Sequence, residues 1–183
     1  MISLRKINSL LVIVVILLLV NHAILALLNM YGIIDYYLDI KITGRRLFYP
    51  VVAHIIISLY LYFSDKVKQD RIYSDLISET TMQIVSGILI IVFAALHILS
   101  YMFISAISKN FSFIMIHLTI DTLLFISLAL HLRVSIPRFM VSLGLLEGKD
   151  SYGNFKKKMN IVILFVLILC VTTEIIWYIG GVI

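Results

Sequence analysis

The sequence predicts an all-α integral membrane protein with five transmembrane helices. Hydrophobic residues make up 62% of the 183 residues and charged residues only 14%, whereas soluble domains contain about 25% charged residues. A membrane span needs about 17–25 predominantly apolar residues, and five stretches satisfy this requirement. They cover residues 7–28, 47–63, 82–106, 111–132 and 159–181. We therefore expect a single transmembrane domain, 1–183, in contact with membrane lipid and with no nucleic-acid partner.

The first span resembles a signal peptide at its start but not at its end. Arg5 and Lys6 precede the apolar run, as in a charged n-region. The run is too long for a signal peptide, however, and no small-residue cleavage site follows it. We expect a retained first helix. The lone cysteine, Cys170, lies in the fifth span, so the chain has no intrachain disulfide.

The distribution of basic residues predicts the orientation. Short cytoplasmic flanks are enriched in Lys and Arg. With the N-terminus inside, inner flanks hold eleven of the 15 basic residues and outer flanks hold four. We therefore expect the N-terminus inside the cell membrane and the C-terminus outside. The inner residues are Arg5, Lys6, Lys66, Lys68, Arg71, Arg133, Arg138, Lys149, Lys156, Lys157 and Lys158.

The segments that connect the spans also predict local structure. The segment 105–110 is a tight outer turn, so the third and fourth spans should be antiparallel neighbours. The stretch "IPRFMVSLGLL" predicts a separate short interfacial helix with Pro137 near its start. Gly148, Asp150 and Gly153 should then break the chain before the basic run Lys156–Lys158.

All five histidines lie in apolar stretches, and the first four spans hold at least one each. Ionisable residues at bilayer depth are costly and usually mark function. At about 1.5 Å rise per residue, four of the five imidazoles lie roughly 9–13 Å below the outer end of their span. We expect these four, from spans one to four, to share one level in the outer half of the membrane. They are His22, His54, His97 and His117.

Facing imidazoles across a four-helix bundle can hold a flat macrocycle, because haem iron accepts two axial nitrogens. The predicted fold is a four-helix haem-binding bundle with a fifth flanking helix. The expected iron ligands are His97 with His22 and His54 with His117, or only one of these pairs. One haem b is the central expectation, and two are the alternative. Hydrogen bonding between helices is the competing explanation for these histidines.

His131 lies fourteen residues after His117, a spacing that places both on one helix face about 21 Å apart. This is the spacing at which one helix ligates two stacked haems, but no other histidine is expected near the inner end. An interfacial histidine beside Arg133 is the equally supported alternative.

Ser86 and Gly87 precede His97 by eleven and ten residues, and Ser86 shares its helix face. Small residues there would leave room for a porphyrin, although Gly87 would equally serve close helix packing.

The segment "QIVSGILIIVFAALHIL" resembles the first haem-ligating helix of the cytochrome b membrane subunits of succinate dehydrogenase and fumarate reductase. The shared pattern is Gln83, Ser86-Gly87, Phe93, His97 and Leu99. The segment "LLFISLALHLRVSIPRFMVSLGLL" resembles the next helix of that family.

The resemblance covers about a third of the chain. It implies haem ligation by His97 and His131, with the basic Arg133 just beyond, and quinone-linked electron transfer. The chain departs from the family because only one helix follows these two, and it has no histidine.

Two carboxyl groups also lie at bilayer depth. Asp121 is one turn beyond His117, where it could orient that imidazole or transfer protons. Glu174 could accept a proton from a quinol, or remain hydrated near the surface. Both are candidates for a proton or quinone site.

The expected function is electron relay between a membrane quinone pool and a redox partner with flavin or iron–sulfur centres. The chain would then be an electron-transfer subunit of a membrane oxidoreductase complex, with quinone as substrate and no catalytic side chain of its own. A non-catalytic membrane anchor or assembly subunit is one alternative. A metal-ion or proton transporter is another, using the membrane histidines with Asp121 or Glu174.

Overall fold

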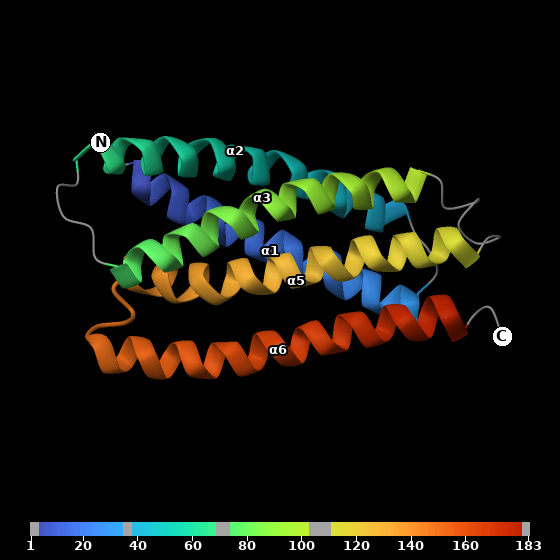
Figure 1. The fold of residues 1–183 in the computed structure, drawn as a ribbon. Coiled ribbons are helices and arrows are strands. Elements are labelled where there is room, and N and C mark those ends of the chain that lie inside the picture. The colour runs from blue at the N-terminus through green and yellow to red at the C-terminus, as the bar shows by residue number, and fades with distance from the viewer. Residues whose placement is uncertain (1–3, 35–37, 69–73, 103–110, 181–183) are drawn as a thin grey trace. The chain divides into compact units, whose positions relative to one another are not determined.

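The structure is a computed structural model that describes residues 4–34, 38–68, 74–102 and 111–180 (Figure 1). In these residues all regular secondary structure is helical, and each of the five helices is long and apolar enough to cross a membrane. The predicted all-α membrane class is therefore confirmed. The helices are α1 (Leu4–Met30), α2 (Leu38–Lys68), α3 (Ser74–Met102), α5 (Phe111–Ser142) and α6 (Lys149–Gly180).

The helices extend beyond the apolar runs that predicted them. α2 begins at Leu38 rather than at residue 47, and α5 continues to Ser142 rather than ending at 132. A helix satisfies its own backbone hydrogen bonds, so it continues through polar residues beyond the hydrocarbon core. The predicted turn at 105–110 and the ends of the third and fifth predicted spans, 103–106 and 181, lie outside the described residues.

The separate interfacial helix predicted for "IPRFMVSLGLL" is wrong. Most of this stretch is the last part of α5, and Pro137 is buried inside that helix. A proline within a helix removes one backbone hydrogen bond and favours a kink without necessarily ending the helix. The predicted breaks at Asp150 and Gly153 are also wrong, because both residues lie within α6.

The helices form two units, Met1–Ile72 and Tyr73–Ile183, which are described separately. In the first unit α1 and α2 pack side by side in opposite directions (Figure 1). Its described residues bury little: Ile40 and Thr43 of α2 are buried, and α1 has no buried residue. Apolar side chains on this pair are therefore available to lipid.

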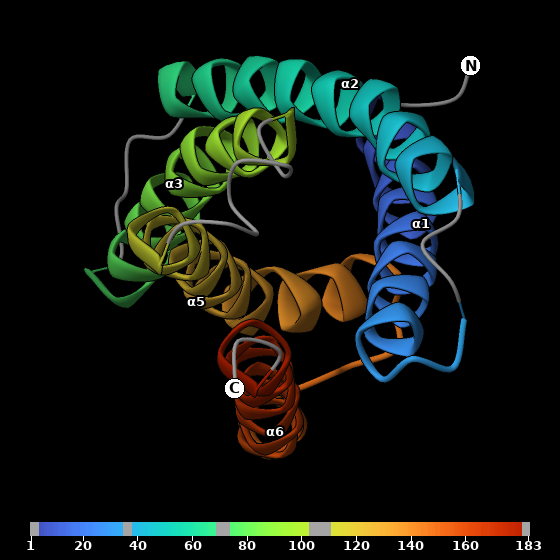
Figure 2. The same ribbon diagram turned by 90° about the vertical axis from the view of Figure 1, so that its right-hand side faces the viewer.

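In the second unit α5 lies between α3 and α6 (Figures 1 and 2). The predicted fifth helix thus packs beside the fourth. Burial follows one stripe of α5 with helical spacing, as expected for the central helix of three. The buried residues of α5 are Ile114, His117, Leu118, Asp121, Leu124, Ser127, Val134 and Pro137.

Glycines form the turn between α5 and α6. The Leu145 amide donates to the Met140 carbonyl at 3.0 Å, which closes α5 with a Schellman-type bond. Gly144 and Gly148 have φ values of 72° and 78°, in the left-handed region that glycine adopts without steric cost.

Candidate functional site

His22 of α1 lies on α2 at the Thr43–Gly44 pair. Its Nδ1 is 3.2 Å from the Thr43 hydroxyl oxygen, and that hydroxyl donates its hydrogen to the Ile40 carbonyl at 2.9 Å. The Thr43 oxygen therefore accepts from Nδ1–H of His22. A Cβ atom on Gly44 would lie 3.3 Å from Cε1 of His22, so the absence of a side chain allows this close approach.

His54 of α2 lies beside the first turns of α1. Its Nδ1 donates to Oδ1 of Asn8 at 3.0 Å, and Ser58 lies 3.4 Å from both atoms. Asn8 and His22 are fourteen residues apart on α1, about 21 Å along the axis. His22 and His54 are thus at different levels of the first unit. The expectation of one shared level is wrong, because α2 begins nine residues before its predicted apolar run.

His131 of α5 lies against the Ser86–Gly87 pair of α3. Its Nδ1 is 3.1 Å from the Gln83 carbonyl oxygen and 3.2 Å from the Ser86 hydroxyl, which itself donates to the Met82 carbonyl at 2.6 Å. A Cβ atom on Gly87 would lie 3.5 Å from Cε1 of this imidazole. His131 thus lies on the small surface where the sequence predicts a porphyrin contact. Arg133, two residues on, is exposed.

His97 and His117 meet at Asp121, near the C-terminal end of α3. Nδ1 of His97 is 2.8 Å from Asp121 Oδ1, and Nε2 of His117 is 3.3 Å from Oδ2. Nδ1 of His117 lies 2.7 Å from the Ser100 hydroxyl, which donates to the His97 carbonyl. The two imidazoles are nearly parallel, with ring centroids 6.3 Å apart.

Aromatic rings and a second carboxyl group enclose this cluster. Tyr101 of α3 and Tyr178 of α6 pack edge-on against the His117 ring at 4.8 and 5.1 Å. Glu174 of α6 interacts with Asp121 and is 2% exposed. We name the set the Asp121 cluster: His97, Ser100, Tyr101, His117, Asp121, Glu174 and Tyr178.

Three buried atoms of the Asp121 cluster have no hydrogen-bond partner among the described residues: His117 Nε2, Asp121 Oδ2 and Glu174 Oε2. Because buried polar atoms are nearly always satisfied, this group requires further hydrogens or a ligand atom. Both carboxyl groups were predictable from the sequence, whereas Ser100, Tyr101 and Tyr178 were not predicted as part of the cluster. Ser100 and Tyr101 follow His97 by three and four residues, which is the signal that places them on its helix face.

The five histidines share one arrangement. In each, Nδ1 bonds to an oxygen on the neighbouring helix. Carbonyl and carboxylate oxygens can only accept, and each hydroxyl concerned gives its own hydrogen to a backbone carbonyl. Nδ1 is therefore a protonated nitrogen in all five. In His22, His54, His97 and His131 this leaves the lone pair on Nε2, whereas Nε2 of His117 faces Asp121 Oδ2 at 3.3 Å and needs a hydrogen between the two atoms. The tautomer of these four is that of a histidine that ligates a metal through Nε2, with Nδ1–H held by an acceptor in the outer shell.

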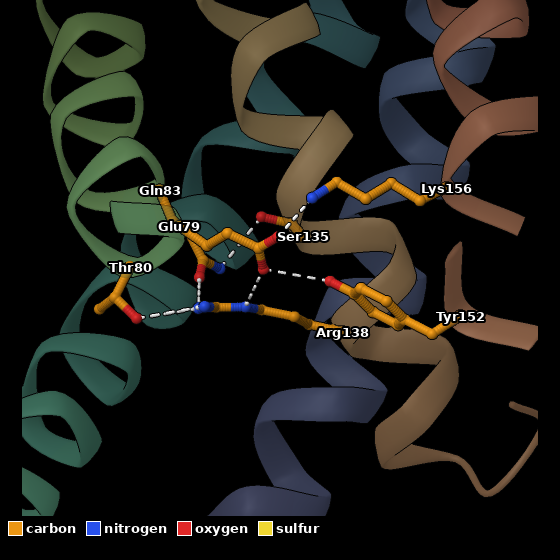
Figure 3. Close-up of polar contacts among 7 residues, drawn as sticks. All are labelled: Glu79, Thr80, Gln83, Ser135, Arg138, Tyr152 and Lys156. Atoms are coloured by element: carbon orange, nitrogen blue, oxygen red, sulfur yellow. Dashed lines mark hydrogen bonds and ion pairs between the residues drawn. The ribbon is translucent and has the colours of Figure 1, made fainter. Parts of the chain in front are cut away.

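A polar network joins the three helices of the second unit at its other end (Figure 3). Glu79 of α3 accepts from Lys156 and from the Tyr152 hydroxyl of α6, and pairs with Arg138 of α5. Arg138 also donates to the Gln83 side chain at 2.9 Å. We name this set the Glu79 network: Glu79, Thr80, Gln83, Ser135, Arg138, Tyr152 and Lys156 (Figure 3).

Gln83 connects the Glu79 network to a histidine. Its side chain lies between Arg138 and Ser135, while its backbone carbonyl accepts from His131. The network therefore fixes the turn of α3 on which His131 rests.

Among the residues that the structure describes, no group of three or more His, Cys, Asp or Glu side chains has a geometry suited to a metal ion. The predicted pairings of His97 with His22 and of His54 with His117 join different units, and they stay predictions. The chain matches no protein-family model, no curated protein and no solved structure.

Proposed function

We propose that the chain is a b-type membrane cytochrome that relays electrons between a quinone pool and a partner redox protein. The shared arrangement of the histidines supports this proposal most directly. Each imidazole that would face iron already has Nδ1–H on an acceptor and its lone pair on Nε2. Haem b supplies a one-electron couple when it is bound, and the surrounding side chains set its potential.

His97 and His131 are suited to be iron ligands. Neither Nε2 atom has a hydrogen-bond partner among the described residues. The side chain of His97 is 24% exposed, whereas that of His117 is 1% exposed and is enclosed by the Asp121 cluster. We therefore assign His117 to the support of the site rather than to the iron.

One haem b stays the central expectation of the proposal. The second ligand beside His97 stays the one that the sequence predicts, His22.

The remaining parts of the proposal come from the sequence. The resemblance of two helices to succinate dehydrogenase and fumarate reductase cytochrome b supports quinone as substrate and a flavin or iron–sulfur partner. The basic flanks support an N-terminus inside the cell membrane and a C-terminus outside. Asp121 and Glu174 remain the candidates for exchanging protons with a quinol.

A difference spectrum tests the haem. Protein purified in detergent from haem-sufficient cells should show the α band of a b-type cytochrome on reduction, and His97→Leu should remove or greatly reduce it. Tyr60→Leu is the control, because Tyr60 is exposed on α2 and has no part in the proposed site. A wild-type protein without a b-type band would contradict the proposal.

A non-catalytic membrane subunit is the second candidate. The observation that favours it is that every Nδ1 bond joins two helices, as a purely structural histidine would do. In that case His97→Leu would change neither the spectrum nor the oxidation of the partner. The same variant therefore separates the two functions.

A further inference from the structure

We infer that α5 and α6 bind the headgroups of anionic phospholipids at the end of the second unit where the Glu79 network lies. Three exposed cations of these two helices contact the lipid phosphates: Arg133, Lys157 and Lys158. The inference goes beyond the proposed function and requires no haem, so each can fail while the other holds.

The Glu79 network determines the level of these cations. Arg138 of α5 and Lys156 of α6 both pair with Glu79, so they lie at one level (Figure 3). Consecutive spans run in opposite directions, and earlier residues of α5 therefore lie beside later residues of α6. At about 1.5 Å per residue, Arg133 and Lys158 lie roughly 7.5 and 3 Å from the network, both toward the middle of the membrane.

This level is the boundary of the hydrocarbon core. The apolar run of α5, residues 111–132, ends directly before Arg133, and the apolar run of α6 begins at Met159, directly after Lys158. At such a boundary Lys and Arg lay their alkyl stems along apolar surface and keep their charges at the headgroup level. Lipid phosphates lie at the same depth in the bilayer, so they are within reach of these side chains.

The three charges are not neutralised within the described part of the chain. Arg138 and Lys156 share Glu79, whereas Arg133, Lys157 and Lys158 take part in none of the ion pairs between described residues. An anionic lipid surface attracts each Lys or Arg close to it, which strengthens binding by about fivefold for each charge.

The acidic side chains favour a lipid over an acidic soluble protein as the partner. Within residues 111–180 the exposed acidic residues are Glu147, in the turn between α5 and α6, and Asp150, in the first turn of α6. Asp150 precedes Lys157 by seven residues and lies about 10 Å farther from the membrane core. A soluble acidic protein would contact these carboxylates first, whereas a headgroup reaches the cations from within the bilayer.

Tryptophan quenching by brominated lipids tests the inference on the full chain. Trp177 is the only tryptophan, so Trp177→Phe combined with Ile161→Trp gives a reporter protein with one tryptophan, three residues beyond Lys158. Ile161 is 70% exposed, so the new ring contacts lipid. In phosphatidylcholine bilayers, brominated phosphatidylglycerol should quench this ring more strongly than brominated phosphatidylcholine at equal mole fraction. The native Trp177, at the other end of α6, is the control and should show no such preference.

Charge removal in the reporter protein tests the three cations. Each single replacement by Gln should lower the relative association constant of phosphatidylglycerol over phosphatidylcholine by about fivefold, and the triple variant should lose the preference. Single variants decide the result if the triple variant does not reconstitute. The matched control removes three exposed charges of α2 and should keep the preference: Lys41→Gln, Arg45→Gln and Arg46→Gln.

Three results would overturn the inference. The first is equal quenching of the reporter by both lipids, and the second is an equal preference at Trp177. The third is an equal loss of preference in the α2 control, since the effect would then follow net charge rather than the surface of α5 and α6.

Discussion

The imidazole of His131 lies directly on the backbone of Gly87, where a Cβ atom would be 3.5 Å from Cε1. Ser86 accepts from the same ring through its hydroxyl. A glycine and a serine hydroxyl of α3 thus contact an imidazole of α5. The Thr43–Gly44 pair holds His22 in the same way.

The size of the side chain at position 87 should decide whether His131 can still pack against α3. Gly87→Ala adds a methyl group at an ordinary contact distance from His131, so the variant should keep wild-type stability within about 1 kcal/mol. Gly87→Leu should displace the imidazole and lower the free energy of unfolding by about 1–3 kcal/mol, as overpacking does. Unfolding in mixed detergent micelles measures both values, and equal losses in the two variants would contradict the packing described.

The hydroxyl of Thr43 should contribute to the packing of α1 on α2. Thr43→Val keeps the shape but leaves Nδ1–H of His22 without this acceptor, and should lower the free energy of unfolding by about 1 kcal/mol. Thr43→Ser keeps the hydroxyl and should lose less. The same micelle titration decides this, and a Val variant as stable as the Ser variant would show that the hydrogen bond contributes nothing.

The Glu79 network should hold one end of the second unit together. Glu79→Gln removes the negative charge shared by Arg138 and Lys156, whose side chains are 27% and 25% exposed. Since the site is partly solvated, the expected loss of unfolding free energy is about 1–2 kcal/mol. Glu147→Gln is the matched control at an exposed position. Hydrogen exchange should also rise at the start of α3, and unchanged exchange there would argue against the network.

Cysteine labelling tests the proposed orientation. In a Cys170→Ser background, Gly32→Cys places a thiol between α1 and α2, and Glu147→Cys places one between α5 and α6. An impermeant maleimide added to intact cells should label the first variant and not the second, because the basic flanks predict that residue 147 faces the cytoplasm. The reverse pattern would invert the topology.

The five spans were predictable because a hydrocarbon core demands long apolar runs, and length alone identifies them. The ends were not. α2 starts among Lys41, Arg45 and Arg46, residues that an apolar window rejects although a helix accommodates them at a membrane surface. Because α2 begins at Leu38, His54 lies farther from the start of its helix than the apolar run from residue 47 predicts.

The histidines were predictable as the unusual feature, but their partners were not. The hydrogen-bonding residues of His54 and His131 lie 46 and 48 positions away along the chain, at Asn8 and Gln83. Such pairs depend on the rotation of each helix about its axis, which sequence spacing does not determine. Asp121 was recognised one turn after His117, yet its shorter contact is with His97 on α3.

The length of α5 has a mechanical consequence. Its 32 residues extend about 48 Å, whereas the hydrocarbon core is about 30 Å thick. Even with tilt, the last turns of α5 reach beyond the acyl chains, and α6 begins beside them. A soluble protein that binds this surface would therefore contact helices that are already folded. Binding would then cost little conformational entropy, because no further residues of this chain need to become ordered.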